Sequence, residues 1–221
     1  MMIECKNICK GFSVGEQKTQ VLKNVSLSVE AGEFVSLMGP SGSGKSTMLY
    51  ILGGLDKADS GSVIIDGREI GNLSDGDESK MRRDDIGFIF QAYNLIDNLT
   101  LEENVLIPAM LSGKKRNEVN ERLDELLNAV GLSEQRHHRP MELSGGQQQR
   151  TAIARALINR PKVIFADEPI GNLDSQNGKE VLELLSKLNK QYGITVLMVT
   201  HSEESTRFGS RVIKLRDGQL V

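Results

Sequence analysis

The sequence predicts an α/β fold: a mainly parallel sheet core with an antiparallel β subdomain and an inserted α-helical subdomain. Short apolar runs typical of strands alternate with helical patterns, and this order requires a parallel sheet with crossover helices. Alternating apolar and polar residues near the amino end, together with Asp-Gly pairs typical of hairpin turns, predict the antiparallel part. The 221 residues, 38% of them hydrophobic, suit one compact domain with a sizeable core.

We expect one domain over 1–221, in which 1–91 and 160–221 form the core with the antiparallel part and 92–159 form the helical insertion. The first range holds two alternating strand segments, a short buried strand, an apolar helical run and a further apolar strand. These are Val21–Val29 and Ser62–Asp66, then Phe34–Met38, Lys45–Leu55 and Ile86–Phe90. Asp66-Gly67 and Asp217-Gly218 mark tight turns of the hairpin kind.

Two helices are predicted in the insertion. Apolar residues recur at the helical period from Glu118 to Val130, and Gly131 follows as a helix stop. The second helix runs from Ser144 to Ile158, with Ser144 as its candidate N-cap. Two strands with a helix between them follow the insertion, at Lys162–Ala166, Lys179–Lys190 and Ile194–Val199 in chain order.

Composition excludes several classes of protein. The net charge of −3 and pI of about 5.7 give no sign of a nucleic-acid footprint. No apolar run approaches the ~20 residues of a membrane-spanning helix, and the charged start is not a signal peptide. Cys5 and Cys9 have no second Cys/His pair at metal-site spacing, so we interpret them as ordinary reduced cysteines, and His137 and His138 as solvated.

A phosphate-binding loop is predicted at Gly39–Thr47, which matches G-x-x-x-x-G-K-S/T between a predicted strand and a predicted helix. Its backbone N–H groups and the helix N-terminus suit phosphate oxygens, Lys45 adds a point charge, and the Ser46 hydroxyl can bind Mg²⁺. The predicted nucleotide-binding residues are Gly39, Ser41, Gly42, Ser43, Gly44, Lys45, Ser46 and Thr47. This P-loop alone leaves kinases and GTPases open.

Two adjacent acids end the predicted strand after the insertion. Beside a P-loop, Asp167 can hold Mg²⁺ through water. Glu168 lies one residue further along, where a carboxylate can orient or deprotonate an attacking water. The pair therefore predicts hydrolysis of the bound nucleotide, with Lys45 stabilising the phosphoryl group that is transferred.

A second anion-binding turn is predicted in Leu143–Arg150, which we call the signature segment: Leu-Ser-Gly-Gly-Gln-Gln-Gln-Arg. Ser144 and two glycines begin a helix there, and a helix N-terminus suits an anion. One nucleotide does not need two such cradles in one subunit. We therefore expect this turn to cap the γ-phosphate that a second subunit holds.

These motifs together resemble those of the ATP-binding subunits of ABC transporters, over nearly the whole chain. The resemblance implies a P-loop NTPase with a RecA-like core, and ATP and Mg²⁺ as cofactors. It likens Gln91 to the Q-loop glutamine, which touches Mg²⁺ and takes part in catalysis, and His201 to the switch histidine at the γ-phosphate. Asp174 resembles the D-loop aspartate, and Phe12 the aromatic that stacks on adenine. From the signature segment it carries over Ser144, Gly145, Gly146 and Gln147.

The resemblance also indicates the kind of ABC protein. Ile170 and Ser202 stand where Thr and Asp are frequent, but neither position carries an essential charge, so we expect an active ATPase. The uninterrupted motifs and the absence of a basic linker favour a transporter over DNA-repair, chromosome or translation relatives. Phe90–Leu95, Gly171–Asp174 and Leu215–Gln219 are similar to the group that serves lipoprotein release, macrolide or peptide efflux and antimicrobial-peptide resistance. A cell-division ATPase, or a soluble ATPase acting on ribosomes or DNA, remains the alternative.

For partners, the resemblance implies an ATP-dependent homodimer, a transmembrane permease subunit and no direct contact with nucleic acid. It implies a cytoplasmic location, peripheral on the inner face of the cell membrane. The expected docking surface lies near Gln91–Leu99 and on the helical insertion. The cargo, the direction of transport and the permease do not follow from the sequence.

Overall fold

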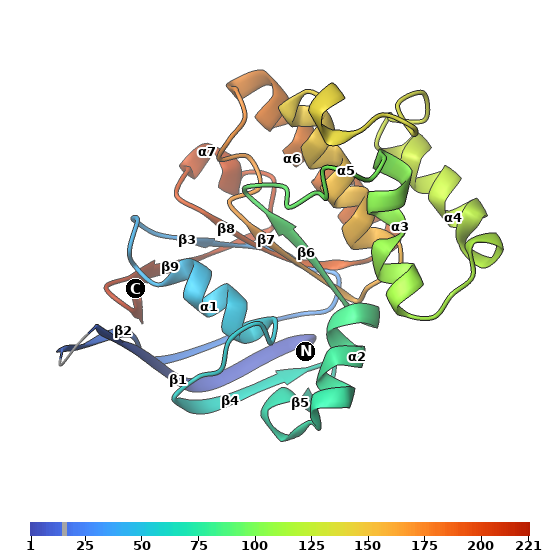
Figure 1. Cartoon of the computed structure of the whole chain (residues 1–221). Helices are drawn as coiled ribbons and strands as arrows, with labels where there is room; N and C mark the ends of the chain where they lie inside the picture. Colours follow the sequence, from blue (N-terminus) through green and yellow to red (C-terminus); the bar gives the residue numbers. More distant parts are fainter. Residues whose placement is uncertain (15–16) are drawn as a thin grey trace.

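A six-stranded sheet forms the centre of the computed structural model, which describes residues 1–14 and 17–221 (Figure 1). Its strand order is β10-β9-β3-β8-β7-β6, and all neighbours are parallel except the hairpin of β10 with β9. The strands are β3 (Phe34–Met38), β6 (Ile86–Phe90), β7 (Val163–Asp167), β8 (Thr195–Thr200), β9 (Arg211–Arg216) and β10 (Gln219–Leu220). The prediction of a mainly parallel core is confirmed.

Side chains of this sheet alternate between two cores. In β7, Val163 and Phe165 face one hydrophobic cluster, while Ile164 and Ala166 face the other, as the two-residue period of a strand requires. The cluster around Ile164 and Ala166 includes side chains from the helices that follow β6. The cluster around Val163 and Phe165 includes side chains from α1 (Lys45–Leu52) and from an antiparallel sheet, and Figure 1 shows α1 between the two sheets.

The antiparallel sheet has the strand order β2-β1-β4-β5. Its strands are β1 (Ile3–Val14), β2 (Gln17–Val29), β4 (Ser60–Ile65) and β5 (Arg68–Glu69). Asp66 and Gly67 both have positive φ, 48° and 73°, as do Asp217 and Gly218, 49° and 79°. Both pairs therefore form the predicted tight turns, between β4 and β5 and between β9 and β10.

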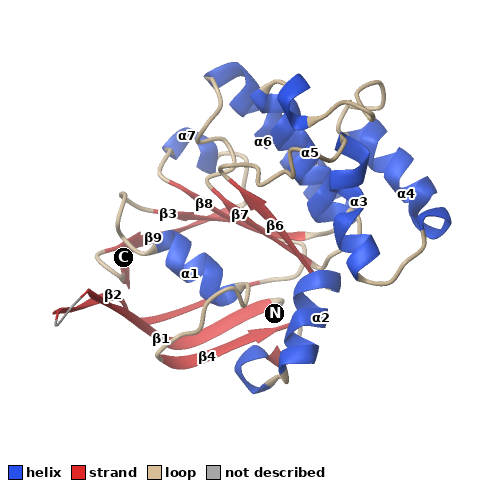
Figure 2. Cartoon of the chain, viewed as in Figure 1, coloured by secondary structure: helices blue, strands red, loops and turns tan. Residues whose placement is uncertain are grey.

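Helices cover the sheets as Figure 2 shows. The bounds are α2 (Asp75–Asp84), α3 (Leu101–Leu111), α4 (Arg116–Ala129), α5 (Gly145–Leu157), α6 (Ser175–Tyr192) and α7 (Glu203–Thr206), with short 3₁₀ turns η1 (Ile70–Asn72) and η2 (Pro140–Glu142). The helices predicted around α4, α5 and α6 are confirmed, and Gly131 ends the α4 region with φ 68°. The expected helix to Leu55 is too long: α1 ends at Leu52, and Gly53 packs where an added Cβ would lie 2.2 Å from the Phe88 ring.

The division of the chain into a core of 1–91 and 160–221 and a helical part of 92–159 stays a proposal. α3, α4 and α5 all fall within the second range. α5, however, also packs closely on the core strand β6, because a Cβ added to Gly87 would lie 2.5 Å from the Ala156 carbonyl oxygen. No helix in the described residues, 1–14 and 17–221, is long and apolar enough to cross a membrane.

Candidate active site

The loop between β3 and α1 has the backbone of a phosphate cradle. Gly44 has φ 96°, which favours glycine, and a Cβ added to Gly39 would lie 2.0 Å from the Leu215 carbonyl oxygen. Lys45 begins α1 and is only 5% exposed, and its Nζ donates to the Pro40 carbonyl at 2.9 Å. The ammonium is therefore held within its own loop, and the loop leads into the N-terminus of α1, which favours an anion.

The Asp167 carboxylate at the end of β7 lies against α1. Ser46 Oγ donates to Asp167 Oδ1 at 2.8 Å, and the Tyr50 hydroxyl donates to Oδ2 at 2.7 Å. Burial of the phenol, with the hydrogen bond to the Asp167 carboxylate, raises the pKa of Tyr50 to about 12. A hydroxyl and a carboxylate oxygen side by side are hard donors of the kind that Mg²⁺ prefers, so Ser46 and Asp167 fit the predicted metal site.

Glu168 and His201 meet at the ends of β7 and β8. Glu168 Oε2 lies 3.0 Å from His201 Nδ1, and the Glu168 backbone has φ 42°. Non-glycine residues rarely adopt a positive φ, and where they do the surrounding structure holds them there. Here the Glu168 N–H donates to the Val199 carbonyl. The His201 side chain is mostly exposed, so the pair opens to the surface.

Gln91, directly after β6, contacts the turn that follows Glu168. Its side-chain Nε2 donates to Asn172 Oδ1 at 3.1 Å, and Asn172 Nδ2 donates back to the Gln91 carbonyl at 3.0 Å. A Cβ added to Gly171 would lie 2.7 Å from Gln91 Nε2. The predicted Q-loop and D-loop residues are therefore in direct contact.

The signature segment begins α5 with a capping box. Ser144 Oγ accepts from the Gln147 N–H, and Gln147 Oε1 accepts from the Ser144 N–H at 2.8 Å, which confirms the predicted N-cap. A Cβ added to Gly146 would lie 2.6 Å from Asn177 Oδ1. Asp174 caps α6 by accepting from the Asn177 N–H, and this hydrogen bond lowers the pKa of Asp174.

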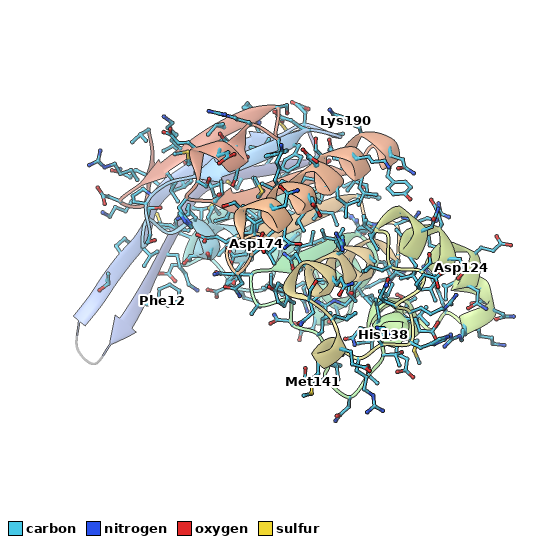
Figure 3. All side chains as sticks on the ribbon, turned by 90° about the horizontal axis from the view of Figure 1, so that it is seen from above. Phe12, Asp124, His138, Met141, Asp174 and Lys190 are labelled. Carbon is cyan, nitrogen blue, oxygen red and sulfur yellow. The ribbon has the colours of Figure 1, made fainter. Side chains whose placement is uncertain are left out.

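The predicted residues therefore form separate groups. The cradle, Asp167, Glu168 and His201 lie at the ends of β3, β7 and β8, whereas the signature segment starts α5; within the described part of the chain no hydrogen bond joins the two. Figure 1 shows the start of α5 well away from the loop before α1. Phe12 lies on the arm formed by β1 and β2 (Figure 3), 44% exposed, with Lys10 Nζ 5.2 Å from its ring centroid.

Two further residues contact these groups, and the sequence reasoning did not single them out. Tyr50 binds Asp167 as described, and Gln149 is fully buried and donates to the Pro169 carbonyl at 2.5 Å. Tyr50 carries a usable signal, because it follows Ser46 by four residues on a predicted helix and so shares its face. The contact of Gln149 joins distant segments and leaves no local pattern.

A P-loop between β3 and α1, a carboxylate pair at the end of β7 and a histidine at the end of β8, the strand between them, define an ATP-hydrolysing P-loop protein. The family model described as ABC transporter matches residues 22–171. The chain belongs to this family, as one of its ATP-binding, ATP-hydrolysing proteins.

Curated relatives match the whole chain. It is 51% identical over 220 residues to the uncharacterized ABC transporter ATP-binding protein MJ1508 of Methanocaldococcus jannaschii, covering 100% of this chain and 98% of that protein. It is 51% identical over 219 residues to the macrolide export ATP-binding/permease protein MacB of Bdellovibrio bacteriovorus, covering 99% of this chain. The chain spans only 33% of the length of that MacB protein.

Solved structures also match nearly the whole of this chain. The dimeric post-hydrolysis state of the ATP-binding cassette MJ0796, bound to ADP and Pi, is 48% identical with a TM-score of 0.89, and covers 99% of this chain and 96% of that one. CbiO1 of Clostridium perfringens, part of the ABC transporter complex cbiONQ, is 28% identical with a TM-score of 0.89, over 100% and 86% of the chains.

Proposed function

We propose that two copies of this chain bind two ATP–Mg²⁺ head to tail and hydrolyse them to drive a membrane partner. The observation that carries the proposal is the separation of the two anion-binding turns. The cradle already has its lysine, hydroxyl, carboxylates and histidine on one chain, while the capped turn at Ser144 lies on another helix. A second subunit gives that turn a phosphate to bind. The MJ0796 cassette, which is similar over almost its whole length, is dimeric in its solved structures, and this supports a dimer here.

In each site the residues divide the work. Lys45 and the backbone N–H groups of the P-loop bind the phosphates, and Thr47 donates to the α-phosphate. Ser46, Asp167 and Gln91 are the residues that would hold Mg²⁺, which neutralises charge on the phosphoryl group when it is bound. Phe12 stacks on the adenine ring. The partner's Ser144, Gly145, Gly146 and Gln147 close the site, and its Asp174 lies at the interface.

Glu168 receives the proton of the attacking water. Its carboxylate lies 3.0 Å from His201 Nδ1, so the histidine can fix the orientation of this carboxylate and also contact the γ-phosphate. Hydrogen-bond donors that are already in place, chiefly Lys45 and the N–H groups of the P-loop, stabilise the negative charge of the phosphoryl group in the transition state. After hydrolysis the contacts that hold the clamp are lost, and the dimer opens.

A groove of about 540 Å³ between α2, β6, α3 and α5 is the proposed docking surface for the membrane partner. Phe88 and Leu111 give it apolar walls. Two arginines also line it, Arg82 in an ion pair with Glu78 and Arg155 hydrogen-bonded to the Tyr93 and Asn94 carbonyls. These apolar walls fit the apolar face of an amphipathic cytosolic segment. Asn94, just after β6, also lines the groove, so movement of the partner can reach Gln91 along a short stretch of chain.

For the cargo, we propose efflux or mechanical transmission that acts on peptides, antibiotics or lipoproteins; the similarity to the macrolide export protein MacB supports the efflux of antibiotics among these. The chain would then lie in the cytoplasm, on the inner face of the membrane. The partner would be a permease, whether a separate subunit or a segment like the rest of the MacB chain.

Size-exclusion chromatography with light scattering tests the head-to-tail site. Glu168→Gln should be a monomer alone and a stable dimer with ATP, since its nucleotide is bound but not hydrolysed. Adding Ser144→Arg should abolish the dimer and leave ATP binding by the monomer intact, because this turn serves the partner's nucleotide. Glu183→Gln, on the exposed face of α6, is the matched control and should hydrolyse ATP like the wild type. Wild-type turnover by Glu168→Gln would exclude Glu168 as the group that accepts the proton.

A pull-down from native membranes with tagged Glu168→Gln and Mg-ATP tests the partner. Recovery of a membrane protein with few helices and a large outer domain supports the transporter. Recovery of ribosomes, DNA-bound proteins or the cell-division machinery would replace it by one of the alternative roles.

A further inference from the structure

The helix after the P-loop presents two hydroxyl groups to one carboxylate. Ser46 and Tyr50 are four residues apart on α1, so their side chains lie one above the other on the same face. Ser46 Oγ donates to Asp167 Oδ1 at 2.8 Å, and the Tyr50 hydroxyl donates to Oδ2 at 2.7 Å. Each oxygen of Asp167 thus has its own donor from α1.

Burial makes both donors important for the carboxylate. Asp167 is only 9% exposed, and a carboxylate that has lost most of its water needs hydrogen bonds to replace it. In the described residues, Ser46 and Tyr50 supply the hydrogen bonds to its side chain. The lysine of the cradle, Lys45, donates instead to the Pro40 carbonyl.

We propose that Tyr50 is a positioning residue for the divalent cation: its hydroxyl fixes Asp167 Oδ2 and thereby points Oδ1 at the metal position beside Ser46. This rests on the proposed assignment of Ser46 and Asp167 to the metal. Ser46 would bind the cation through a lone pair of Oγ, and its O–H could still donate to Asp167 Oδ1. Tyr50 is the donor to the other oxygen, Oδ2, and so holds the carboxylate in one rotamer without itself being a ligand of the metal or the nucleotide.

The hydroxyl of Tyr50 can be separated from its ring. The half-buried ring packs against the cluster between the two sheets, alongside α1 and β7 residues, and phenylalanine keeps that packing. Tyr50→Phe therefore removes one hydrogen bond and little else. Tyr192→Phe is the matched control, because the Tyr192 hydroxyl also donates to a carboxylate, Glu125, at 2.7 Å, but on α6 away from the cradle.

Mn²⁺ binding in the presence of ATP measures the effect directly, with free Mn²⁺ followed by electron paramagnetic resonance. The Glu168→Gln background prevents turnover during the titration. We expect Tyr50→Phe to lower the Mn²⁺ affinity by about tenfold or more, the effect of one hydrogen bond to a charged group. ATP affinity in EDTA should stay at the value of the parent, while the melting temperature should fall slightly because a buried oxygen of Asp167 loses its donor. Tyr192→Phe should match the parent in both the Mn²⁺ and the ATP affinity.

Two results would overturn the inference about Tyr50 itself. One is an unchanged Mn²⁺ affinity in Tyr50→Phe. The other is an equal loss of ATP affinity in EDTA, which would make the hydroxyl a purely structural group. A third variant separates this from failure of the site as a whole: if Asp167→Asn keeps the parent's Mn²⁺ affinity, the metal assignment falls and the role of Tyr50 falls with it.

Discussion

Glu102 at the start of α3 joins three segments of the helical part by ion pairs between its buried carboxylate and two partly exposed arginines. Its carboxylate is 8% exposed and accepts from Arg116 Nη2 at 2.7 Å and from Arg136 Nε and Nη2 at 3.0 and 2.9 Å. Arg116 begins α4, and Arg136 lies in the loop before the signature segment. Glu102→Gln keeps the shape of the side chain and removes its charge.

The expected cost of this substitution follows from burial on each side. Breaking a buried ion pair by removing one partner costs about 3–5 kcal/mol. Here the two arginine side chains are 55% and 32% exposed, so water can solvate them again. Glutamine also keeps one acceptor oxygen. We therefore expect Glu102→Gln to lower the free energy of unfolding by about 2–3 kcal/mol at neutral pH.

The pH dependence gives a second, independent check. Burial raises the pKa of Glu102, but hydrogen bonds and charges from Arg116 and Arg136 outweigh burial and bring the pKa below its ordinary value of 4.5. A lowered carboxyl pKa adds stability that is complete above the unfolded-state pKa and is lost as the pH falls through the folded-state pKa. The difference between wild type and Glu102→Gln should thus be largest at neutral pH and shrink below about pH 4.5.

Urea unfolding, followed by circular dichroism over a series of pH values, measures both effects. Glu121→Gln, on the exposed face of α4, is the control and should change stability by less than about 0.5 kcal/mol. A Glu102→Gln effect as small as that of the control at neutral pH, or one that stays constant below pH 4.5, would refute the argument.

Three other substitutions test the nucleotide site. Lys45→Ala should weaken ATP binding at least about tenfold, by loss of the only side-chain charge of the cradle, and isothermal titration measures it. Gly39→Ala should abolish ATP binding and lower the melting temperature, because its Cβ would lie 2.0 Å from the Leu215 carbonyl oxygen; an unchanged melting curve would contradict this. Phe12→Ala should weaken ATP about fivefold or more, while Phe12→Trp keeps the affinity, if the ring stacks on adenine.

The sequence predicted the parts of the fold that have a regular local signal. Strands β3 and β6 match their predicted ranges residue for residue, because buried strands are continuous apolar runs. α2 was missed since only Met81 of its residues is buried and the rest carry no apolar period. α3 was missed because it is apolar on most sides and contains Pro108. No range was predicted for β1, because its register shifts near Cys5 and Ile8 break the regular alternation of apolar and polar residues in a strand.

The site follows the same division. Lys45, Ser46, Asp167 and Glu168 belong to short motifs whose chemistry can be derived from the residues themselves. Their pairing through space depends on the sheet order, in which β3, β8 and β7 are neighbours. The contact of Gln91 with Asn172 depends on turns that no local pattern predicts.

The separation of the signature segment from the cradle has a genetic consequence. In the proposed head-to-tail dimer, each chain lends Lys45 to one site and Ser144 to the other. A chain with a substituted Lys45 and a chain with a substituted Ser144 therefore each form only inactive homodimers. When the two chains are expressed together, the mixed dimer has both substitutions in one site, and its other site contains only wild-type residues. Two inactive alleles of this gene can thus complement each other.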